Sequence, residues 1–142
     1  MTMRPLPDPG GPLLQPWRGS AEALLETANH QAPLWWLRGS RMRTKAGLMD
    51  EWAAAAQFPP HFGGTWDALR DALADLPEGG TFLVLEAQQL LQDAPPGELQ
   101  TLLGVLREVR KDLAPQPFAL ILQAEPEHFD TLVEGLRALG AN

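Results

Sequence analysis

The sequence predicts an α/β fold, with a small three-stranded parallel sheet flanked by helices and extra segments at both ends. Three short apolar runs carry this prediction: LWWL at 34–37, TFLVLE at 81–86 and FALILQ at 118–123. Such runs are typical of strands in a sheet that is covered on both faces. Segments with helical periodicity separate the runs, and this alternation favours parallel strands joined by helical crossovers.

The N-terminal residues are predicted to form an arm and a short helix. Five prolines and two glycines fall within residues 1–16, and this composition favours a poorly ordered chain. Ser20 is a candidate N-cap for a helix that runs to about His30, and Pro33 stops that helix. The first strand follows directly.

Two helices are predicted between the first and second strands. Thr44 is a candidate N-cap for a helix that ends at Ala56, because the following FPP stretch at 58–60 leaves helical geometry. Thr65 is a candidate N-cap for the next helix, whose apolar residues have helical spacing and bury one face. The opposite, solvent-facing side carries Asp67, Arg70 and Asp71.

The C-terminal half alternates in the same way. A short helical stretch at 87–92 precedes a long helix over about 98–113, and Pro126 opens a last amphipathic helix that Gly140 ends. The predicted organisation has an N-terminal arm and short helix at 1–33, a central domain at 34–123 and a C-terminal helical extension at 124–142.

The net charge of −7 is unevenly distributed. Residues 1–57 carry six basic and five acidic side chains, whereas residues 58–142 carry five and thirteen, so the two parts have charges of +1 and −8. An acidic surface disfavours nucleic acid and favours a basic partner, although solubility alone also explains it. One basic cluster is either a phosphate contact or a solvated edge: Arg38, Arg41, Arg43 and Lys45.

The composition also excludes several classes of protein. Cysteine is absent, so neither a disulfide framework nor a thiolate metal site can form. No apolar run approaches the roughly 20 residues of a membrane span, and the N-terminus has no secretory-signal pattern. A cytoplasmic protein without membrane contact is therefore expected.

The sequence contains no pattern for a catalytic, cofactor or metal site. The three histidines are far apart, and neither a P-loop, a dinucleotide fingerprint nor a nucleophile elbow is present. The Gly63-Gly64 pair precedes a helix and could cradle an anion, but turn geometry explains it without a ligand. An enzyme that uses His61 with Asp67 or Asp71 is one hypothesis, but no nucleophile, metal or oxyanion site supports it.

Asp67 and Asp71 lie four residues apart on the predicted helix, where like charges repel by roughly 0.2–0.5 kcal/mol. From the pattern alone, a solvated face remains an adequate interpretation. The surrounding motif nevertheless resembles the barstar family of small intracellular ribonuclease inhibitors, and so does the element order over roughly 34–123. The motif consists of Pro59, Phe62, Gly63, WDAL at 66–69, Asp71 and Leu73.

The resemblance implies a protein without catalysis, whose loop and acidic helix plug the active site of a small basic ribonuclease or related nuclease toxin. By position, Asp71 would be the main phosphate mimic and Asp67 the second anchor, with Glu108 as a peripheral acidic contact. The loop contacts would be His61, Phe62 and Gly63. Trp66 would belong to the core.

Two residues depart from the family's pattern. His61 stands where the contact loop usually has tyrosine, and Arg70 stands at a binding-face position that is aromatic in the founding inhibitor. Arg70 can pair with either aspartate and places a positive charge where a basic enzyme should approach. This favours a diverged target with an acidic group near its rim. The alternative is a barstar-fold interaction domain with a non-nuclease partner.

Overall fold

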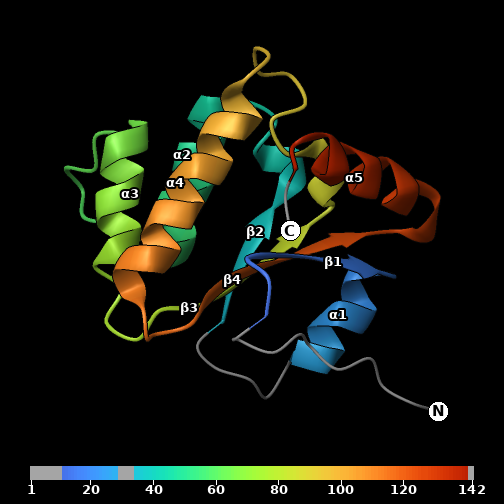
Figure 1. The fold of residues 1–142 in the computed structure, drawn as a ribbon, viewed down its shortest axis with the longest axis horizontal. Coiled ribbons are helices and arrows are strands. Elements are labelled where there is room, and N and C mark those ends of the chain that lie inside the picture. The colour runs from blue at the N-terminus through green and yellow to red at the C-terminus, as the bar shows by residue number, and fades with distance from the viewer. Residues whose placement is uncertain (1–10, 29–33, 141–142) are drawn as a thin grey trace.

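The computed structural model describes residues 11–28 and 34–140 of the chain. Its centre is a parallel sheet with the strand order β1-β4-β3-β2 (Figure 1). The strands are β1 (Leu14–Arg18), β2 (Leu34–Arg38), β3 (Gly80–Leu85) and β4 (Phe118–Ala124). The predicted α/β class with a parallel sheet is therefore confirmed.

The sheet has four strands, so the prediction of three was one strand short. The additional strand, β1, begins within the segment that the sequence predicted to be poorly ordered. It pairs with β4, with Leu14 opposite Leu120. Pro16 has no N–H for a ladder, but an edge strand tolerates proline because one of its sides needs no partner. The remainder of the predicted arm, residues 1–10, lies outside the described residues.

Five α-helices surround the sheet within the described part of the chain: α1 (Ala21–Ala28), α2 (Lys45–Ala56), α3 (Trp66–Ala74), α4 (Glu98–Leu113) and α5 (Pro126–Ala138). Two 3-10 turns accompany them, at Gly39–Arg41 and Ala87–Gln89. The three predicted N-caps are confirmed. Backbone N–H groups donate to their hydroxyl oxygens at 3.0–3.1 Å: Ser20 in α1, Thr44 in α2 and Thr65 in α3. The predicted end of α1 near His30 lies outside the described residues.

The helices cover the two faces of the sheet unequally. α1 alone covers one face, where Leu24 packs with Leu83 and Ile121 of the central strands. The other four helices contribute to the larger core on the opposite face, in which the Trp52 and Phe82 rings have centroids 5.2 Å apart. Figure 1 accordingly has α1 below the strands and the remaining helices above them. This two-sided cover explains why the strands are continuously apolar.

The segments on both flanks of the central region pack directly on the sheet. α5 contacts β1 and β4, and Gln123 of β4 is fully buried. Its amide donates to the Gly19 carbonyl after β1 at 2.6 Å and accepts from the Glu86 N–H after β3 at 2.8 Å. The division at 33/34 and 123/124 remains a prediction, although these contacts join the parts into one sheet.

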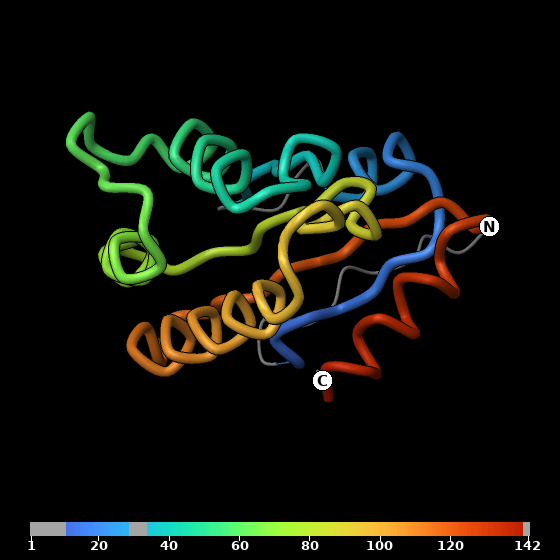
Figure 2. Tube along the Cα trace, turned by 90° about the horizontal axis from the view of Figure 1, so that it is seen from above, coloured from blue at the N-terminus to red at the C-terminus, as the bar shows by residue number. Residues whose placement is uncertain are grey.

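α3 stands at one end of the molecule, beside α4 (Figures 1 and 2). Leu69 and Leu73 of α3 are fully buried in the larger core. The loop that precedes α3 projects at the same end of the molecule (Figure 2). One side of α3 is therefore anchored, and the other side is available to solvent.

Candidate functional site

The loop at 57–65 is held by two phenylalanines. The rings of Phe58 and Phe62 have centroids 5.0 Å apart, and both pack against the larger core. The Phe62 N–H donates to the Pro59 carbonyl at 2.9 Å, which closes a turn around the exposed His61. Phe62 is thus half-buried and supports the loop, while His61 presents its side chain at the tip.

The backbone conformation favours glycine at position 64 but not at position 63. Gly64 has φ +68°, a left-handed conformation that favours glycine. Gly63 lacks a positive φ, and a Cβ at this position would meet only the Ala68 Cβ, at 3.9 Å. Local structure therefore explains Gly64 but not Gly63. The space around Gly63 is therefore largely open.

The N-terminus of α3 places Asp67 in the first helical turn, where the side chain is exposed. The helix dipole stabilises a carboxylate there. The preceding Trp66 is half-buried against the core, and the Lys45 ammonium lies over its ring, 5.4 Å from the centroid. Trp66 thus supports the start of the helix, in agreement with the core role that the sequence suggested.

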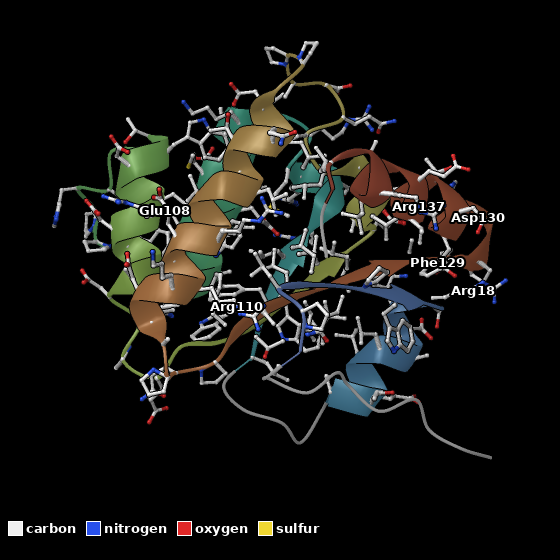
Figure 3. All side chains as sticks on the ribbon, in the orientation of Figure 1. Arg18, Glu108, Arg110, Phe129, Asp130 and Arg137 are labelled. Carbon is white, nitrogen blue, oxygen red and sulfur yellow. The ribbon has the colours of Figure 1, made fainter. Side chains whose placement is uncertain are left out.

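Asp71 and Glu108 share one arginine. Arg70 Nη2 lies 3.4 Å from Asp71 Oδ1, and Arg70 Nη1 lies 3.4 Å from Glu108 Oε2. The second pair connects α3 to α4, and Figure 3 has Glu108 on the side of α4 that faces α3. Both carboxylates remain well exposed, at 73% for Asp71 and 61% for Glu108.

The acidic part of the site thus spans two helices. α3 supplies Asp67 and Asp71, one helical turn apart, and α4 supplies Glu108 beside them through the ion pairs of Arg70. The sequence indicated that Arg70 could pair with an aspartate of its own helix, and the ion pair between Arg70 and Asp71 confirms this. It did not indicate the pair with Glu108, because 38 residues separate the two positions.

The basic cluster of the sequence is divided among separate structural roles. Arg38 pairs with Glu51 at 2.9 Å, and Arg43 pairs with Asp93 at 2.8 Å. The hydrogen bond from Arg43 holds the pKa of Asp93 below its usual value, against a smaller upward effect of burial. Lys45, as noted, lies over Trp66. These contacts indicate structural roles for Arg38, Arg43 and Lys45 and provide no argument for a phosphate site.

Residues 11–28 and 34–140 contain no group of three or more histidine or acidic side chains arranged to hold a metal ion. Within the same residues, no helix has the length and apolarity that crossing a membrane requires.

The comparison with protein families gives a match to the central part of the chain. The family described as Barstar (barnase inhibitor) matches residues 33–125, which include the loop, α3 and α4. No curated protein matches the chain. The matched range leaves β1 and α1 on one flank, and α5 on the other.

Proposed function

The chain belongs to the barstar family, and from this membership we propose that it is an inhibitor or immunity protein of a nuclease. Its target would be a small basic ribonuclease or a related nuclease toxin, whose active site it blocks with α3 and the preceding loop. In this proposal the protein performs no catalysis, needs no cofactor and acts in the cytoplasm.

One structural observation supports the proposal: two exposed carboxylates lie one turn apart on a helix whose other side is packed into the core. Asp67 and Asp71 face solvent, while Leu69 and Leu73 on the same helix are fully buried. The Thr65 cap fixes the first turn. A binding surface that is already rigid loses little conformational entropy when a partner docks.

The chemistry of the two partners is complementary. A ribonuclease active site must hold phosphates, so it concentrates arginine, lysine and histidine. Carboxylates that replace consecutive phosphates accept charge-assisted hydrogen bonds from those groups. The charge of −8 on residues 58–142 adds attraction at longer range, which speeds the encounter with a basic protein.

Each proposed contact has a distinct role. Asp71 would be the main phosphate mimic, Asp67 the second anchor and Glu108 a peripheral acidic contact. His61 would cover the target's site from the loop tip. The open backbone at Gly63 would permit close approach, and Phe62 would keep the loop in shape through its contact with Phe58.

The test is capture of partners from extracts of the source cells on three immobilised forms of the full chain. These are the wild type, the Asp67→Asn/Asp71→Asn variant and a control, Glu22→Gln/Glu26→Gln. The control also removes two exposed carboxylates, but from α1 on the opposite face of the sheet.

We expect a basic nuclease on the wild type and on the control, but not on the Asp67→Asn/Asp71→Asn form. The captured nuclease should lose its RNA hydrolysis when wild-type protein is added. Recovery of the same non-nuclease protein on all three forms would refute the proposal.

A second candidate is an interaction domain with a non-nuclease partner. Arg70 favours it, because this cation already neutralises part of the acidic surface. Hydrogen exchange with a captured partner would separate the two functions. Protection centred on 58–75 supports the inhibitor, whereas protection centred on 126–139, which forms α5, supports the alternative.

A further inference from the structure

Arg70 occupies the position within the acidic site that a partner's cation would have to take. It contacts Asp71 and Glu108 at the same time, each at 3.4 Å. Charge-assisted hydrogen bonds between such groups are usually about 2.7–2.9 Å long, so both contacts are long. Because the two carboxylates are also exposed to water, these ion pairs are weak and can be exchanged.

The hydrogen-bonding capacity of Arg70 is not exhausted in the free protein. A guanidinium has five N–H donors in a fixed planar arrangement. Two of its nitrogens contact carboxylates, and Nε is buried without a hydrogen-bond partner among the described residues. Because Nε is buried, the donors that can turn to a new acceptor are the N–H groups of Nη1 and Nη2, once another cation takes their present acceptors.

Arg70 is not needed to hold α3 against α4. The apolar residues of the larger core already join the two helices, with Leu69 and Leu73 from α3 and Leu106 and Val109 from α4. Each of these side chains is at most 1% exposed. A purely structural role for the exposed ion pairs is thus a minor one, and the placement of Arg70 in the acidic surface calls for a different explanation.

We infer that Arg70 determines the specificity of the proposed inhibitor, by selecting nucleases that carry a carboxylate beside the cation that binds Asp71. When cations of the target take both Asp71 and Glu108, Arg70 must find a new acceptor or remain as an unpaired positive charge against a basic surface. A target aspartate or glutamate next to the cation at Asp71 satisfies Arg70, whereas a wholly basic site is repelled. This inference rests on the proposed function and deepens it.

Barnase, the nuclease named in the family's description, is the probe for the first test. Its affinity is measured for the full-length wild type, Arg70→Gln, Asp71→Asn and a control, Arg107→Gln. Arg107 is an exposed arginine of α4 next to Glu108, so the control removes the same charge nearby. Thermal unfolding of each form verifies that the variants are folded.

Removal of Arg70 should strengthen the binding of barnase by about tenfold or more, because a like charge facing a basic surface opposes association. The Arg107→Gln control should stay within about twofold of the wild type, as is usual for an exposed charge outside the contact. If Asp71→Asn weakens binding but Arg70→Gln does not strengthen it, the specificity inference fails and the inhibitor proposal survives. If the wild type binds barnase and Asp71→Asn leaves that binding unchanged, the inhibitor proposal itself fails.

A selection experiment tests the stated chemistry of the target. A displayed library of barnase, randomised at surface positions around its active site, is selected separately on wild-type protein and on Arg70→Gln. We expect wild type to enrich aspartate or glutamate at one or more positions, and Arg70→Gln not to enrich them. Equal enrichment on both forms, or none on either, overturns the inference.

Discussion

The Glu51 carboxylate accepts hydrogen bonds from both the backbone and the side chain of Arg38. The Arg38 N–H lies 2.8 Å from Oε2 and Arg38 Nε lies 2.9 Å from the same oxygen, while Nη2 reaches Oε1 at 3.2 Å. Glu51 belongs to α2, and Arg38 ends β2, an edge strand. One carboxylate thus satisfies an N–H at the end of the sheet's edge strand and fixes α2 beside it.

Replacement of Glu51 by glutamine should destabilise the fold by about 1–2 kcal/mol at neutral pH, because bonds to a charged acceptor are lost. Burial is the largest single influence on Glu51 and raises its pKa. The hydrogen bonds and charge of Arg38, together with Arg41, outweigh it and hold the pKa below the ordinary value. Chemical denaturation of the wild type and Glu51→Gln measures the difference.

The ion pair between Glu51 and Arg38 should also make the stability of the fold depend on pH. A carboxylate whose pKa is lower in the folded state stabilises the fold above its unfolded pKa, and this contribution disappears as the pH falls through the folded pKa. The stability difference between wild type and Glu51→Gln should therefore be constant at neutral pH and decrease below about pH 4. Asp93→Asn, which breaks an exposed pair, is the control and should change stability much less. An equal effect of the two substitutions would contradict the prediction.

Leu24 and Leu25 of α1 provide a matched pair for testing the N-terminal segment. Leu24 is fully buried against the sheet, whereas Leu25 is 36% exposed. Leu24→Ala should lower the free energy of unfolding by about 2–5 kcal/mol, because it leaves a cavity in a packed cluster. Leu25→Ala should cost well under half of that amount.

Denaturant unfolding followed by tryptophan fluorescence makes this measurement. It gives the free energy of unfolding of each variant and the slope with which that free energy falls as denaturant concentration rises. A large effect with an unchanged slope means that α1 unfolds together with the family-matched region, although it lies outside residues 33–125. No effect of Leu24→Ala would mean that α1 is only loosely attached, against the contacts in the structure.

The sequence predicted the helices well because their signals are local. The ends of α4 at Glu98 and Leu113 follow from apolar spacing, and the caps at Thr44 and Thr65 follow from side-chain chemistry within three residues. β1 was missed because Pro16 and its proline-rich surroundings argue against a strand. Only the position of β1 at the edge of the sheet makes that proline acceptable.

The candidate site was predictable only in part. The family resemblance drew attention to Asp67, Asp71 and Glu108, since spacing alone was equally consistent with a solvated helix face. The contact between Arg70 and Glu108 depends on how α3 packs against α4, and no local pattern specifies that packing. The support of Trp66 by Lys45 was likewise missed, because the two residues come from different helices.

Loss of the Thr65 cap should lower the stability of the fold and fray the start of α3. The Thr65 hydroxyl accepts the Ala68 N–H at 3.0 Å, one of the few bonds that fix the start of α3. Thr65→Ala should cost about 1 kcal/mol of stability, whereas Thr65→Ser keeps the hydroxyl and should cost much less. Amide exchange of residues 66–69 would report the fraying directly. Equal exchange in the two variants would show that the cap does not hold the helix in place.

Alanine substitutions of Gly63 and Gly64 should distinguish a loop glycine that serves binding from one that serves folding. Gly63→Ala should leave the unfolding transition almost unchanged, because the added Cβ meets only the Ala68 Cβ at 3.9 Å. Gly64→Ala should cost about 1 kcal/mol, because φ +68° is unfavourable for alanine. If a partner approaches the loop closely, Gly63→Ala will weaken capture of that partner while the thermal midpoint stays constant. Normal capture by a stable Gly63→Ala protein would remove Gly63 from the contact surface and leave the carboxylates of α3 as the test of the proposed function.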